Sequence, residues 1–122
     1  MSRSTIKALS IKQPWADLIA SGQKTIETRT WSTKYRGQLL IVSSAKPTGP
    51  RSGLALCTVR VTDCRPMTAE DETAAQCPLY PGAWAWILTD VRPIEYLIPL
   101  KGRLGIYEVS WPGGQPVASI QP

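Results

Sequence analysis

The segment GQKTIETR (residues 22–29) gathers three charged side chains directly after an apolar stretch. In an extended strand Glu27 and Arg29 share one face, because side chains alternate with a period of two. Lys24 lies three residues before Glu27, so it can join them only if the chain turns irregularly, which Gly22 makes easy. Two interpretations remain open. Either this is a solvated strand face with an incidental Glu27–Arg29 pair, or the three residues form a cluster in which Glu27 pairs with one cation and leaves the other available for a ligand.

The rest of the composition limits which chemistry is available. The 122 residues include no histidine, which excludes Ser-His-Asp and Cys-His catalysis and leaves Lys, Glu, Asp or Tyr for any acid–base step. Cys57, Cys64 and Cys77 form no CxxC pair, so we expect reduced thiols rather than a disulfide framework or a zinc site. The sequence predicts neither a metal nor a cofactor.

Length and charge set the broad class. The chain is long enough for one domain with one core, and its net charge of +5 favours an anionic partner, of which nucleic acid is the commonest. No apolar run approaches the ~20 residues that cross a bilayer. The opening residues MSRSTIKALS contain no signal-peptide core. We therefore expect an intracellular, cytoplasmic protein with no membrane association.

The helix signals are local and short. Pro14 suits a first helical turn, an apolar stripe follows it, and Gly22 suits the position just past a helix end, so a helix is predicted over about 14–21. A weaker acidic helix is predicted within 66–76, with its acidic residues 70–72 forming a solvated helix start.

Strand signals dominate the remainder of the chain. Alternating or continuous apolar runs predict strands at 7–11, 25–31, 37–45, 54–64, 84–91 and 102–110, with 94–100 between the last two. The near-continuous run at 37–45 predicts a strand buried on both faces. Five to seven strands and one good helix, without a βαβ rhythm, predict a mainly β, α+β fold. Its sheet would be closed or nearly closed on itself, with the helix beside it. Residues 1–110 are expected to form a single domain, followed by a Pro/Gly-rich tail at 111–122.

A family resemblance sharpens these expectations. The stretches SIKQPWADLIASGQKTIETRTW and YRGQLLIVSSAKP resemble the activating signal cointegrator homology (ASCH) domains, whose G-x-K-x-x-E-x-R pattern is met at Gly22, Lys24, Glu27 and Arg29. The segment IPLKGRLGIYEV continues the likeness. The resemblance implies a small PUA-like β-barrel. It also implies a charged cleft between helix and barrel as a site for RNA, single-stranded nucleic acid or a nucleotide.

Four further residues are candidate ligand contacts. Trp31 continues the Glu27 face and could stack on a base. Lys46 follows a strand end where the family's cleft opens, and could contact a phosphate or base or be an ordinary loop cation. Gln13 and Trp15 belong to the QPW element of the resemblance, although Trp15 also lies on the apolar helix stripe, where core packing is the usual role.

The resemblance also leaves an enzymatic alternative open. Some bacterial relatives look like amidohydrolases that deacylate N4-acetylcytidine, with a lysine at the Lys24 position and a threonine nucleophile three residues later. This sequence has Glu27 at the latter position, so the nucleophile does not carry over. A ribonuclease is a further possibility, with Lys24 and Glu27 as acid and base. Binding is the favoured interpretation.

Overall fold

The computed structural model describes residues 4–111 and consists mainly of strands. In chain order the elements are β1 (Ser4–Ile11), α1 (Trp15–Ala20), β2 (Ile26–Arg29), β3 (Gly37–Ser43), β4 (Leu54–Pro66), the 3-10 helix η1 (Ala69–Asp71), α2 (Glu72–Ala75), β5 (Trp84–Pro99) and β6 (Ile106–Trp111). The predicted α+β class is confirmed.

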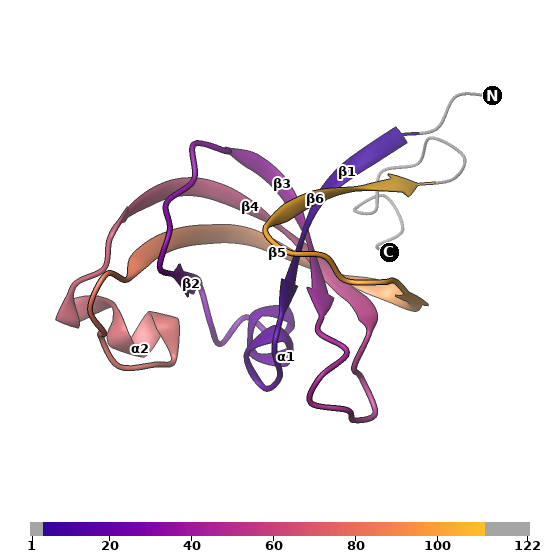
Figure 1. The fold of residues 1–122 in the computed structure, drawn as a ribbon, viewed down its shortest axis with the longest axis horizontal. Helices are drawn as coiled ribbons and strands as arrows, with labels where there is room; N and C mark the ends of the chain where they lie inside the picture. The colour runs from indigo at the N-terminus through magenta and orange to yellow at the C-terminus, as the bar shows by residue number, and fades with distance from the viewer. Residues whose placement is uncertain (1–3, 112–122) are drawn as a thin grey trace.

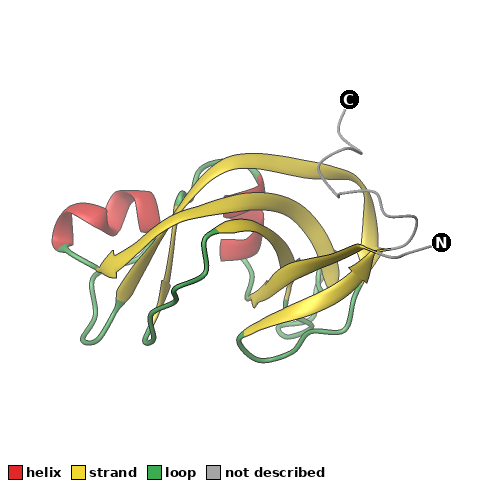
Figure 2. Ribbon diagram, turned by 90° about the horizontal axis from the view of Figure 1, so that it is seen from above, coloured by secondary structure: helices red, strands yellow, loops and turns green. Residues whose placement is uncertain are grey.

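All six strands belong to one sheet, in the order β2-β5-β4-β3-β1-β6. The β1–β3 pair is parallel and the other neighbours are antiparallel. Among the described residues β2 and β6 are the two edges, so the sheet is not a closed barrel, which corrects the expectation of closure. β2 has only four residues and pairs with β5 alone. The long strands bend strongly instead (Figure 2). α1 packs with Trp86 and α2 packs with Ala85, adjacent residues of β5 whose side chains point to opposite faces of the sheet (Figure 1).

The core lies on both faces of this bent sheet. α1 buries Ala16 and Ile19 against one face, where Leu39, Ile41 and Trp86 are almost fully buried. The alternate residues of β3 join a second cluster on the other face. The continuous apolar run at 37–45 therefore reflects a strand buried on both faces, as predicted.

Element boundaries differ from the expectations in the last third of the chain. The segment 94–100 is not separate, because β5 runs unbroken from Trp84 to Pro99, with three register shifts against β4. The final strand begins at Ile106 rather than 102, and residues 101–105 form a loop that matters for the site. The predicted tail lies outside the described residues from 112 onward, and the single-domain boundary at 110 remains a prediction.

The acidic residues at 70–72 are not simply a solvated helix start. Asp71 is 6% exposed, and its carboxylate accepts two hydrogen bonds from the Arg65 guanidinium, at 2.7 and 2.9 Å. It also accepts one from the Thr68 backbone N–H at 2.8 Å. These bonds hold the pKa of Asp71 well below its usual range, and they fix the turn that leads into α2.

Across residues 4–111 the structure contains no helix long and apolar enough to span a membrane.

Candidate functional site

The link between α1 and β2 decides where Lys24 points. α1 ends at Ala20, and Gly22 follows with a φ of +85°, a conformation that favours glycine. The Lys24 N–H then donates to the carbonyl of Leu18 at 2.9 Å, so the chain folds back on the helix before β2 begins at Ile26. The three-residue spacing between Lys24 and Glu27 requires an irregular link of this kind, since a regular strand would place the two side chains on opposite faces.

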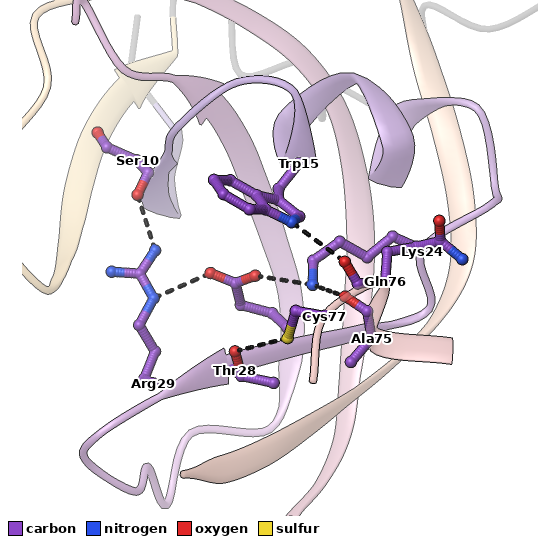
Figure 3. Close-up of polar contacts among 9 residues, drawn as sticks. Ser10, Trp15, Lys24, Thr28, Arg29, Ala75, Gln76 and Cys77 are labelled. Carbon is purple, nitrogen blue, oxygen red and sulfur yellow. Dashed lines mark hydrogen bonds and ion pairs between the residues drawn. The ribbon is translucent and has the colours of Figure 1, made fainter. Parts of the chain in front are cut away.

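The turn brings the three charged side chains of the octapeptide together. Glu27 Oε1 lies 3.6 Å from Lys24 Nζ, and Glu27 Oε2 accepts a hydrogen bond from Arg29 Nε at 3.0 Å. Lys24 Nζ also donates to the Ala75 carbonyl, and Arg29 Nη2 donates to the Ser10 carbonyl at 2.8 Å (Figure 3). Glu27 therefore pairs with both cations rather than one. The solvated-face interpretation does not fit this geometry.

Burial sets the electrostatics of this Lys24–Glu27–Arg29 network. Lys24 is 2% exposed and Glu27 is 6% exposed. Burial lowers the pKa of Lys24, because a desolvated ammonium is disfavoured, while the nearby Glu27 carboxylate opposes that shift. The Arg29 side chain is 24% exposed, so it is the most accessible member of the network.

The network lines one side of a pocket of about 990 Å³. Trp15 and Trp31 line it too, and each is 37% exposed although tryptophan is ordinarily well buried. The Trp15 indole N–H donates to the Gln76 carbonyl at 3.4 Å, and the Trp31 ring meets Trp86 edge-on at a centroid distance of 4.9 Å. Trp15 is thus a pocket residue rather than a core residue, whereas Trp86 is fully buried.

Two of the predicted ligand residues lie outside this pocket lining. The Gln13 side-chain oxygen accepts a hydrogen bond from the Asp17 backbone N–H at 2.9 Å, which satisfies a free donor in the first turn of α1. Lys46 is exposed on the loop after β3. Their contacts with a ligand remain predictions.

The pocket includes residues that sequence reasoning did not select. Lys12 and Cys77 line it, as does the segment 100–105. Cys77 Sγ lies 3.7 Å from the Thr28 hydroxyl. The KGRLG sequence at 101–105 was visible only as part of the family resemblance, and nothing in its pattern indicated that it would lie opposite residues 24–29.

The cysteines and carboxylates form no metal centre in the described part of the chain, where no group of three or more potential ligands is found. All three thiols are free. Burial raises the pKa of Cys57 to about 12, so that thiol is inert at neutral pH.

Comparison with known proteins identifies the family. The model of the ASCH domain matches residues 9–98, which is most of the chain. The chain belongs to the ASCH domain family. Activating signal cointegrator 1 is 46% identical in human and 44% identical in mouse, in each case over 43 residues. Each match covers 35% of this chain and 7% of the relative, so the similarity concerns a small part of those much longer proteins.

Solved structures support the fold of this ASCH domain. The crystal structure of the ASCH protein from Zymomonas mobilis has a TM-score of 0.58 at 18% identity, covering 78% of this chain and 72% of that chain. A single-residue variant of that protein matches with the same TM-score and identity, covering 77% and 75%. At this identity the likeness establishes the shared fold alone.

Proposed function

We propose that this ASCH domain binds single-stranded RNA in the pocket beside the Lys24–Glu27–Arg29 network. The family is associated with RNA binding. The observation that carries the proposal is the combination within one pocket of two half-exposed tryptophans and a buried, fixed set of charged hydrogen-bonding groups. Proteins that read unpaired RNA use these two ingredients, stacking on a base face and bonding to its edge.

The roles of the residues follow from their exposure. Trp15 and Trp31 offer ring faces at the pocket wall, where a base can stack. Arg29 keeps donors beyond those used by Glu27 and Ser10, since a guanidinium carries five N–H groups. Lys24 is held by Glu27 and Ala75, so it acts chiefly by keeping the carboxylate in place. Each position is then preorganised, which reduces the entropy lost on binding.

Fluorescence anisotropy of a labelled RNA about ten nucleotides long tests the proposal. Trp31→Ala should weaken binding by about 1–3 kcal/mol, the usual contribution of one stacked base. Lys7→Ala is the control, because Lys7 pairs with Glu108 at the surface and does not line the pocket. Circular dichroism checks that each variant is folded. Absence of RNA binding by the wild type, or equal affinity of the two variants, contradicts the proposal.

Hydrolysis of a modified nucleoside is the second candidate. Its supporting observation is the lowered pKa of Lys24, since an amine must be neutral to act as a base. The adjacent Glu27 opposes that shift, and the lysine is already occupied by a carboxylate and a carbonyl. Lys24 and Glu27 are therefore better suited to a fixed binding network than to proton transfer.

A further inference from the structure

The pocket separates its charges into a nearly neutral floor and a cationic rim. Five cations and one carboxylate line it, which gives a local charge of +4. At the floor, Lys24 and Arg29 share Glu27. The rim cations are Lys12, Lys101 and Arg103. All three are exposed, and within residues 4–111 none forms an ion pair with a described carboxylate.

The rim loop, residues 101–105, is held in place against β1. A Cβ at Gly102 would come within 2.7 Å of the Ser10 hydroxyl, so the backbone approaches this strand as closely as only glycine allows. The same Ser10 hydrogen-bonds Tyr107 at 2.7 Å through its side chain and accepts from Arg29 through its carbonyl. Floor and rim are therefore joined through one residue of β1.

Leu104 in this loop has an unusual exposure. It lines the pocket and is 98% exposed, whereas the other exposed large apolar side chains of the described residues lie between 37% and 44%. It directly follows Arg103 and comes three residues after Lys101, and both cations are exposed. An exposed apolar side chain in the same loop as two exposed cations matches the chemistry of a nucleic-acid strand, which alternates apolar base faces with phosphates.

We infer that a single base enters the pocket while the strand on either side of it is held at the rim. Lys12, Lys101 and Arg103 bind the flanking phosphates, and Leu104 packs on the base next to the one inserted. Arg29 contacts the inserted base rather than the backbone, because Glu27 already neutralises one of the two floor charges, while Lys24 holds the Glu27 carboxylate in place. This inference rests on the proposed RNA binding. It names the occupant as a strand rather than a free nucleotide.

The first experiment compares two double variants of equal charge. Lys101→Ala/Arg103→Ala removes two rim cations, whereas Lys34→Ala/Arg60→Ala removes two exposed cations that do not line the pocket. Each lost phosphate contact should reduce the slope of log K against log salt by about 0.7, so the rim variant should lose about 1.4. Extrapolated from about 1 M to about 0.1 M salt, that slope corresponds to roughly 25-fold weaker binding. The Lys34/Arg60 variant should retain the wild-type slope.

The second experiment addresses Leu104 and the nature of the ligand. Leu104→Ala should weaken RNA binding by about threefold to tenfold and leave the salt slope unchanged, since it removes apolar contact without charge. The four ribonucleoside 5′-monophosphates should each bind at least about tenfold more weakly than the oligonucleotide, because they lack the flanking phosphates.

The outcomes separate this inference from the proposed function. If the wild type binds RNA and the rim variant behaves like the Lys34/Arg60 control, the rim assignment is wrong while RNA binding stands. Equal affinity for a mononucleotide and the oligonucleotide overturns the strand assignment in the same way. Cosedimentation with anionic vesicles that is lost in Leu104→Ala, with RNA binding unchanged, would assign the loop to a membrane surface instead. No RNA binding by the wild type overturns both.

Discussion

Replacing Glu27 by glutamine should strongly destabilise the protein, because Glu27 is the shared counter-charge of two cations. The substitution keeps the shape and removes the charge, which leaves Lys24 at 2% exposure without an ionic partner. Removing one partner of a buried pair typically costs about 3–5 kcal/mol.

An upper bound on this loss follows from the lysine itself. Lys24 can avoid being a buried cation by releasing its proton and becoming a neutral amine. At pH 7, neutralising a lysine with an ordinary pKa of about 10.4 costs about 4.6 kcal/mol, or about 1.36 kcal/mol for each of about 3.4 pKa units. Because Arg29 also loses its partner but remains partly solvated, we expect Glu27→Gln to lower the free energy of unfolding by about 3–4 kcal/mol.

The loss should depend on pH in a defined direction. Burial lowers the pKa of Lys24 in the folded protein, and Glu27→Gln removes the charge that most strongly opposes that effect. Between the lowered folded pKa and the unfolded value near 10.4, the unfolded chain binds more protons, so stability rises with pH. The deficit of Glu27→Gln relative to wild type should therefore shrink from pH 7 toward pH 10.

Urea unfolding followed by tryptophan fluorescence and circular dichroism measures these changes. The matched control is Glu108→Gln, which breaks the exposed Lys7–Glu108 pair and should cost no more than about 1 kcal/mol. Adding Lys24→Met to Glu27→Gln removes the unpaired buried charge. The double variant should therefore lose about 2 kcal/mol less unfolding free energy than the two single variants lose in total. A cost of Glu27→Gln no greater than that of Glu108→Gln, or a deficit that stays constant between pH 7 and pH 10, would show that Glu27 is not the shared counter-charge.

Three further predictions concern other parts of the molecule. Asp71→Asn should cost about 2 kcal/mol at pH 7. Because folding lowers the pKa of Asp71, the wild-type advantage in thermal unfolding should begin to shrink below about pH 4 and continue to fall as the pH drops further; an advantage as large near pH 2 as at pH 7 would be inconsistent with the assigned role. Alkylation at neutral pH, mapped by mass spectrometry, should spare the buried Cys57 and modify Cys77, which lines the pocket. Bound RNA should slow the reaction of Cys77, and equal labelling of both thiols in the folded protein would refute this prediction. Incubation with N4-acetylcytidine should release little or no cytidine by chromatography, and turnover that is abolished in Lys24→Ala would establish the enzymatic alternative.

Local sequence signals predicted much of this structure. The helix at 14–21, the buried strand at 37–45 and the irregular link after Gly22 all depend on neighbouring residues, and the structure contains each of them. The convergence of Lys24 and Glu27 followed from a three-residue spacing that a regular strand cannot reconcile.

What could not be predicted depends on contacts between distant segments. The Ala75 carbonyl that holds Lys24 is 51 residues away, and no local pattern indicates it. The rim loop reaches the pocket only because β6 pairs with β1, which brings it against Ser10. Trp15 shows the same limit, because helical periodicity places it on the apolar stripe, whereas the structure places it at the pocket wall with 37% of its surface exposed.

We propose that the buried network serves binding rather than folding. Apolar residues of similar size can replace a buried ion pair with little or no loss of stability, so a network of this kind is weak evidence for a structural role. Here it lies beneath two half-exposed tryptophans, and Arg29 retains partial exposure to the pocket. The double variant Lys24→Met/Glu27→Gln separates the two explanations, since it removes both buried charges together. A purely structural network predicts that restoring stability also restores RNA affinity, whereas a binding network predicts that affinity stays low in a protein that folds well.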